Sequence, residues 1–118
     1  MDTLVSVRCL AWEWAAYLRE RGHRVAFADD WCMLRSRNGQ GIRYRWLLLC
    51  ARKPTRRLTI SERQTVQAQL LRGKRARERV YVVLGFHIHD GRLLVVPAAR
   101  ALQEPRLKSS VGGIPWEW

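Results

Sequence analysis

Residues 42–51 read IRYRWLLLCA, and this stretch decides the fold. Its first half alternates, with Arg43 and Arg45 on one face and aromatic side chains on the other, which is typical of a half-buried strand. Its second half is apolar on both faces through Leu47–Leu49. A strand that is buried on both faces belongs in the interior of a sheet with covered faces, so these residues predict a central strand.

The residues before this strand predict its neighbours in the sheet. Residues 38–41 read NGQG, and asparagine and glycine tolerate the positive φ of a tight turn. Trp31–Arg37 is therefore the expected hairpin partner. Arg24–Ala28 predicts one more strand, and Asp29–Asp30 forms the bend between the two.

Two helices are expected on either side of these strands. Apolar residues recur at intervals of three and four over Leu4–Glu20, as in an amphipathic helix, and Gly22 follows where a C-cap belongs. Thr59 and Glu62 have the spacing of a capping box, which predicts a second helix over Ile60–Arg72.

The later part of the chain predicts two more strands. Gly73 and the basic run Lys74–Arg79 read as a loop, followed by a buried strand over Val80–Ile88. A turn then leads to a last strand, Arg92–Val96, which Pro97 closes.

The predicted fold class is α/β, with element order α-β-β-β-α-β-β and a central mixed β-sheet flanked by helices. We expect one domain over residues 1–102, because 118 residues bury one modest core. Residues 103–118 form a tail that ends in IPWEW, which is too aromatic for ordinary disorder. The tail is expected to dock on the domain or on a partner.

Charge is the strongest functional signal. The chain carries 22 Lys and Arg against 10 Asp and Glu, a formal net charge of +12. Ten basic residues lie within 28 positions that hold two acidic ones, and this set is the predicted nucleic-acid-binding surface: Arg52, Lys53, Arg56, Arg57, Arg63, Arg72, Lys74, Arg75, Arg77 and Arg79. Arginine predominates, and its planar fork matches phosphate oxygens. Nucleic acid is the expected partner, and DNA is favoured over RNA.

The lack of membrane and signal segments and the number of cysteines narrow the class of protein further. The chain has no apolar run long enough to cross a bilayer and does not start like a secretory signal, so we expect a soluble, cytoplasmic protein without a membrane partner. The three cysteines, Cys9, Cys32 and Cys50, are odd in number and lack a CxxC pair. They are interpreted as buried small hydrophobes. The four tryptophans in predicted elements, Trp12, Trp14, Trp31 and Trp46, are expected in the core.

These elements together resemble a known family. An N-terminal helix with an inward Glu13, an acidic turn, a hairpin, a buried strand ending in Cys50-Ala51-Arg52 and a helix beginning Ser61-x-x-Gln64 are similar to the PD-(D/E)XK nuclease superfamily. The likeness is greatest to its Holliday-junction-resolvase-like and virus-type replication-repair branches. It implies a restriction-endonuclease-like fold.

The resemblance also implies a site. In this family an aspartate and a Glu-x-Lys hold a divalent metal that activates water for attack on a phosphodiester. Asp30 matches the aspartate, and Glu13 matches an acidic residue on the first helix, so both are candidate metal ligands. Arg52 and Gln64 are further candidate catalytic residues, and Mg²⁺ is the implied cofactor if the site is active.

Cys50 departs from the family pattern at the position of a carboxylate. A thiolate favours softer metals than Mg²⁺, and Arg52 stays protonated where the family has lysine. Glu62 on the following helix could replace the missing carboxylate. We therefore predict a catalytically degenerate, DNA-binding protein of nuclease-like fold, with an active structure-specific endonuclease using Asp30, Glu13 and Glu62 as the alternative.

Other interpretations of the sequence stay open. Asp29–Asp30 also suits an ordinary turn, and Glu13 suits a surface ion pair. His87 and His89, with Asp90 beyond, could bind zinc or act as acid and base in a small basic ribonuclease toxin or RNA-binding protein. A protein-interaction subunit with a basic face is a further option, and two copies could pair as a homodimer.

Overall fold

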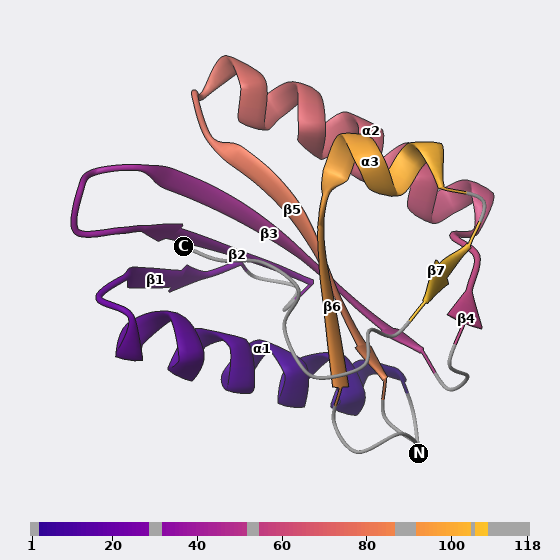
Figure 1. The fold of residues 1–118 in the computed structure, drawn as a ribbon, viewed down its shortest axis with the longest axis horizontal. Coiled ribbons are helices and arrows are strands. Elements are labelled where there is room, and N and C mark those ends of the chain that lie inside the picture. Colours follow the sequence, from indigo (N-terminus) through magenta and orange to yellow (C-terminus); the bar gives the residue numbers. More distant parts are fainter. Residues whose placement is uncertain (1–2, 29–31, 52–54, 87–91, 105, 109–118) are drawn as a thin grey trace.

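Strand β3 (Arg43–Ala51) lies at the centre of a five-stranded sheet in the computed structural model, which describes residues 3–28, 32–51, 55–86, 92–104 and 106–108 (Figure 1). The other strands are β1 (Arg24–Phe27), β2 (Met33–Arg37), β5 (Arg79–Phe86) and β6 (Arg92–Pro97), in the order β1-β2-β3-β5-β6. The central position of β3 agrees with its apolar second half.

The sheet is mixed, as expected. β1, β2 and β3 form an antiparallel meander, β3 and β5 are parallel, and β6 is antiparallel to β5. A parallel pair needs a crossover connection, and helix α2 (Ile60–Arg75) lies within that connection. The structure thus confirms a single α/β domain with a central mixed sheet and flanking helices.

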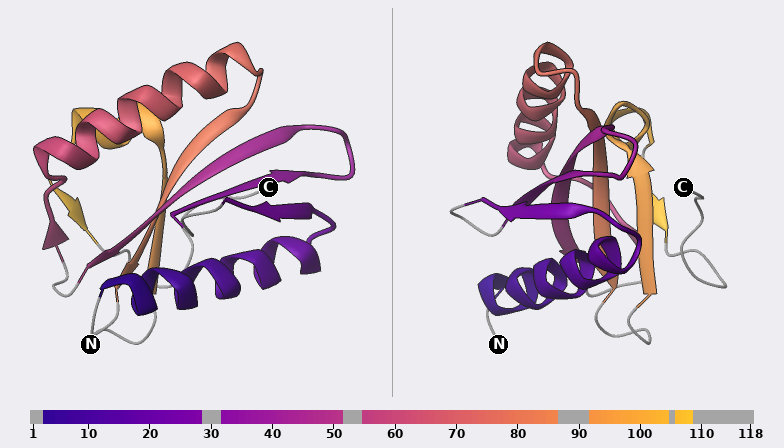
Figure 2. Two further views of the ribbon diagram at one scale, coloured as in Figure 1. Left: turned by 180° about the vertical axis from the view of Figure 1, so that it is seen from behind. Right: turned by 90° about the vertical axis from the view of Figure 1, so that its left-hand side faces the viewer.

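Helix α1 (Thr3–Glu20) covers one face of the sheet (Figures 1 and 2). Because side chains alternate along a strand, Trp46 and Leu48 of β3 point to this face. They pack there against Trp14 and Leu18 of α1, and all four side chains are almost fully buried. This cluster also contains Trp14 and Trp46 in edge-to-face contact, with ring centroids 5.3 Å apart.

Helices α2 and α3 (Ala98–Gln103) cover the opposite face. Leu47 of β3 packs in a second core with Val66 of α2, Val82 of β5 and Ala101 of α3. Helix α2 contacts β3 and β5, and α3 contacts β5 and β6. On this face, β1 and β2 carry the exposed residues Arg24, Ala26, Arg35 and Arg37.

Three short elements were not expected from the sequence. Helix α3 follows Pro97 directly and buries Ala98 and Ala101. The two-residue strands β4 (Thr55–Arg56) and β7 (Leu107–Lys108) form a separate small antiparallel sheet. β7 belongs to the stretch predicted as a tail, and residues 109–118 of that tail lie outside the described residues.

Helix α2 ends later than predicted, because Gly73 is helical rather than the start of a loop. A Cβ at Gly73 would come within 2.2 Å of Val80 Cγ2 on β5. Glycine therefore allows the helix to approach the sheet closely. The capping box at the other end is confirmed, with Thr59 and Glu62 bonding each other's backbone amides.

Two interpretations of burial were wrong. Trp12 is 53 % exposed, although its ring lies 5.1 Å from that of Phe27. Cys9 and Cys32 are exposed, and Cys50 is half-buried. Cys9 and Trp12 lie outside the stripe of α1 side chains that is buried against the sheet. No described helix is both long and apolar enough to cross a membrane.

We predict that Gly73→Ala destabilises the fold. Val80 is β-branched and buried, so its methyl group cannot move aside freely, and overpacking of this kind costs about 1–3 kcal/mol. Urea unfolding gives the change in the free energy of unfolding. Gly39→Ala is the matched control, because a Cβ there meets nothing within 4 Å. Equal stability of the two variants would contradict the close approach.

Candidate nucleic-acid interface

Five arginines share one face of the meander β1–β3, at the end where α2 finishes. The strand register places Arg24 opposite Arg37 and Arg37 opposite Arg43, so these three form a row across the sheet. A second row contains Ala26, Arg35 and Arg45. We call the five residues Arg24, Arg35, Arg37, Arg43 and Arg45 the arginine array.

The array places like charges directly opposite one another. Such pairs have Cβ atoms about 5 Å apart and destabilise a sheet by roughly 0.2–1 kcal/mol each. Arginine side chains can splay apart, but three adjacent strands leave little room to do so. Counter-charges from elsewhere in the protein or from a ligand would relieve this repulsion.

Glu78 supplies the counter-charge for the second row. It lies just before β5, and its side chain is only 2 % exposed. Arg35 approaches Oε2 through Nε at 2.9 Å and Nη2 at 2.8 Å, and Arg45 approaches Oε1 through Nε at 2.9 Å and Nη2 at 2.7 Å. Arg45 also donates to Gln69 Oε1 at 2.5 Å, which ties β3 to α2.

The first row has no such carboxylate. Arg43 donates to the backbone oxygen of Ala76 at 2.6 Å. The side chains of Arg24 and Arg37 make no hydrogen bond or ion pair with another described residue. The three arginines therefore keep their positive charge available.

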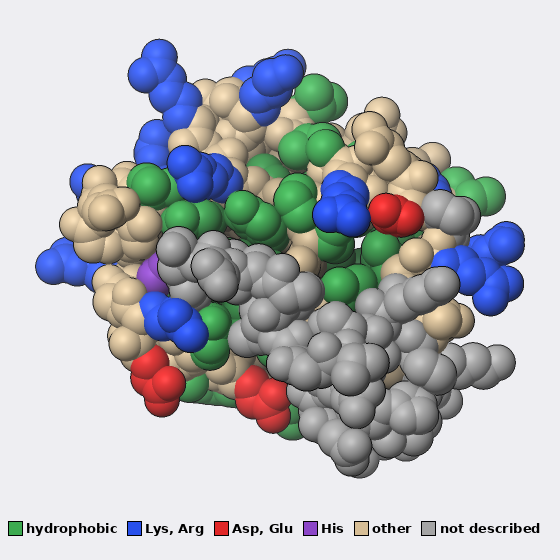
Figure 3. Space-filling model, viewed as in Figure 1, with side chains coloured by type: hydrophobic (Ala, Val, Ile, Leu, Met, Phe, Trp, Pro, Cys, Tyr) green, Lys and Arg blue, Asp and Glu red, His purple; other side chains and the backbone are tan. Residues whose placement is uncertain are grey.

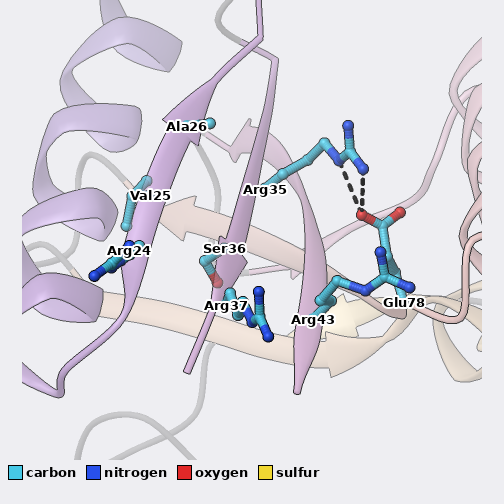
Figure 4. A pocket seen from close by; sticks show the side chains of 8 residues that line it. All are labelled: Arg24, Val25, Ala26, Arg35, Ser36, Arg37, Arg43 and Glu78. Atoms are coloured by element: carbon cyan, nitrogen blue, oxygen red, sulfur yellow. Dashed lines mark hydrogen bonds and ion pairs between the residues drawn. The ribbon is translucent and has the colours of Figure 1, made fainter. Parts of the chain in front are cut away.

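A shallow pocket of about 280 Å³ opens over these residues. Arg24, Arg35, Arg37, Arg43 and Glu78 line it, with short residues of β1 and β2 between them. Figure 4 shows Arg35 turned toward Glu78, while Arg37 and Arg43 lie beside each other on neighbouring strands. Four arginines against one carboxylate leave a positively charged pocket.

The polar side chains on the opposite face of the sheet from the array, Ser36 and His23, are neutral. Ser36 points away from the pocket into the core beside α1, where its hydroxyl accepts Trp46 Nε1–H at 2.8 Å. His23 Nδ1 lies 2.9 Å from the same oxygen. Burial lowers the pKa of His23, so the imidazole is uncharged at neutral pH and adds no charge to the site.

The carboxyl end of α2 adds exposed basic residues beside the array. After the end of the helix, the Glu78 N–H donates to Gly73 O at 2.7 Å. Arg77, the residue before Glu78, has a positive φ of 58°. This left-handed position favours glycine, and an arginine there costs about 1 kcal/mol. Figure 3 shows basic side chains gathered over this end of α2; the residues here are Arg72, Lys74, Arg75, Arg77 and Arg79.

The remaining predicted basic residues lie at the other end of α2. Arg57 is exposed there, whereas Arg56 pairs with Glu62 and Arg63 donates to Leu102 O at 2.8 Å. A helix of 16 residues is about 24 Å long. The predicted surface is therefore divided between two ends, and Arg52 and Lys53 lie outside the described residues.

The described candidate metal and catalytic residues do not lie together in the structure. Asp30 and Arg52 lie outside the described residues. Glu13 is exposed on α1 rather than inward, and Gln64 is exposed on α2, on the opposite side of the sheet. Both oxygens of Glu62 are occupied, one by the Thr59 amide at 2.9 Å and the other by Arg56.

Cys50 occupies the carboxylate position of the family pattern as a neutral thiol. Burial raises its pKa to about 11, against the opposing effect of the Arg56 charge. A raised pKa disfavours the thiolate, which is the form of cysteine that binds metals and acts as a nucleophile. Within the described ranges, no three His, Cys, Asp or Glu side chains converge on a metal-binding geometry. His87, His89 and Asp90 fall outside those ranges.

Comparison of the chain with protein-family models, with curated proteins and with solved structures gives no match.

Sequence reasoning missed the array, although every arginine in it is visible in the sequence. Arginines occupy alternate positions in three consecutive predicted strands, at 24, 35 and 37, and 43 and 45. Alternation alone places each pair on one face of its own strand. The rows appear only once the register between strands is known.

We predict that Glu78→Gln strongly destabilises the protein. The substitution leaves the guanidinium of Arg45, whose side chain is 9 % exposed, without its counter-ion, and loss of a partner in a buried pair costs about 3 kcal/mol or more. Chemical unfolding measures the change. Glu104→Gln removes a carboxylate from the exposed pair with Arg100 and should cost about 0.5 kcal/mol or less. Similar losses in both variants would refute the role of Glu78.

Proposed function

We propose that the chain is a DNA-binding protein that holds phosphates with the arginine array and the carboxyl end of α2. The observation that carries this proposal is the row Arg24–Arg37–Arg43, three guanidiniums in register with no described carboxylate partner. Phosphate oxygens are matched ligands for such forks, because arginine can donate two parallel hydrogen bonds to them.

The energetics of the fold support a polyanion as ligand. The array opposes like charges, and Arg77 keeps a side chain at a left-handed position that suits glycine. Both features lower the stability of the free protein and add positive charge at the same end. A bound polyanion offsets both costs, since it neutralises the charges and releases its own counter-ions.

We further propose that the fold is restriction-endonuclease-like and that the nuclease site is degenerate. What supports the likeness is the arrangement of α1, an antiparallel meander, a crossover helix on the opposite face and a parallel strand after it. What supports degeneracy is the neutral thiol of Cys50 and the engagement of Glu62 by Thr59 and Arg56. On this proposal the protein binds the phosphodiester backbone of DNA and does not cleave it.

The test compares two charge-matched double variants of the full chain. Arg24→Gln with Arg37→Gln removes two charges from the array, whereas Arg100→Gln with Arg106→Gln removes two exposed charges elsewhere. Fluorescence anisotropy with labelled duplex DNA gives affinity over a range of salt concentrations. We expect the slope of log affinity against log salt to fall by about 2 in the array variant, roughly one for each lost phosphate contact. The control variant should change it far less.

Two further measurements complete this test: the stability of the protein variants and the integrity of the DNA. Without DNA, the array variant should unfold at a higher or equal denaturant concentration, because like-charge opposition is relieved. Incubation with Mg²⁺ should leave the DNA intact. Equal loss of affinity in both variants would contradict binding at the array, and cleavage abolished by Asp30→Ala would contradict degeneracy.

A further inference from the structure

The outward face of α2 has no charged side chain over three turns. From Ile60 to Leu71 the exposed positions are Ile60, Ser61, Gln64, Thr65, Gln67, Ala68 and Leu71. The charged residues of this stretch, Glu62 and Arg63, are half-buried and bonded to Arg56 and to Leu102 O. Charged residues are 27 % of the chain, so a solvated helix face would be expected to carry several.

Apolar groups are exposed on the same face. Ile60 is 78 % exposed and Leu71 is 55 % exposed, and they are the two most exposed large apolar side chains of the described chain. Gln64 and Gln67 lie between them at helical spacing, so the four side chains form one stripe along the helix. Such a stripe is suited to contact with another molecule.

Basic residues bracket this neutral face. Arg57 precedes the helix, and Arg72, Lys74 and Arg75 follow Leu71 as exposed residues of its last turns. The neutral section from Ile60 to Leu71 rises about 17 Å along the helix axis. The major groove of B-form DNA is about 12 Å wide and has a phosphate backbone on either side. The pattern of charge thus complements a groove with neutral base edges between two anionic walls.

We propose that α2 lies in the major groove of duplex DNA, with Gln64 and Gln67 facing base edges and the basic ends on the two backbones. This inference rests on the proposed DNA-binding function and adds base reading to it. Glutamine can donate to adenine N7 and accept from its N6 amino group, and the Leu71 side chain can contact a thymine methyl group. The site therefore prefers A·T pairs. The deep, narrow major groove of duplex RNA does not admit the helix.

The experiment selects bound sequences from a library of random DNA duplexes and then titrates a selected duplex and a scrambled one. The wild-type chain should select a short motif that contains A·T pairs. Gln64→Ala with Gln67→Ala should lower affinity for the selected duplex at least about fivefold and leave affinity for the scrambled duplex unchanged. Both positions are exposed and alanine favours helix, so the variant should stay folded. Gln103→Ala, an exposed glutamine on α3, is the matched control.

The outcomes separate this inference from the proposed function. If the wild-type chain retains no DNA at low salt, both fail. If it binds DNA through Arg24 and Arg37 but selects no motif, or keeps its preference in the double variant, only base reading by α2 is overturned. Equal affinity for duplex RNA of the same sequence would also overturn it. So would a homodimer in sedimentation that Leu71→Glu dissociates, because the face would then belong to a second copy.

Discussion

The ion pairs of Glu78 with Arg35 and Arg45 hold the basic end of the molecule together. The carboxylate is buried, and it receives two donors from each arginine. Through these contacts the start of β5 is joined to β2 and β3, and Arg45 extends the link to Gln69 on α2. Without this carboxylate, three adjacent strands would present five arginines on one face with no counter-charge from the described chain.

The arginines of the array that do not pair with Glu78 give this end of the protein its positive charge. Glu78 offsets one of the two charges in the row that lies nearer the core, and the outer row Arg24–Arg37–Arg43 keeps its charge. The same short segment that delivers Glu78 also places Arg77 at a left-handed position and brings the basic end of α2 beside the pocket. One turn of chain therefore stabilises the sheet and concentrates positive charge next to it. Local instability at this end is what an anionic ligand can relieve.

The sequence predicted the large elements because each has a local cause. Alternation and a run of leucines define β3, a three-and-four spacing defines α1, and a capping box starts α2 at Ile60. It did not predict Gly73 as helical, because the close approach of Val80 comes from a strand that returns over the helix. It did not predict α3 or β4 and β7, which are too short for a periodic signal. The arginine rows were missed since register is a property of three strands together, not of any one.

The candidate site was predicted only in part, because some of its residues have partners that are distant in the sequence. The exposed basic residues after Leu71 were identified from their density alone. Arg56, Arg63 and Glu62 were counted as available, but their partners come from sequence positions that only the fold brings near, such as Leu102. The sequence predicted Cys50 to be an unsuitable Mg²⁺ ligand because thiolates favour softer metals, and the burial that raises its pKa could be seen only in the fold.

The most direct measurement follows the guanidinium Nε–H signals of individual arginines by NMR while duplex DNA is added. We predict that the signals of Arg24, Arg37 and Arg43 shift at the lowest DNA concentrations. The Arg45 signal should stay in place, since its donors are held by Glu78 and Gln69. Shifts confined to arginines remote from the meander, such as Arg100, with an unchanged array, would contradict the central claim.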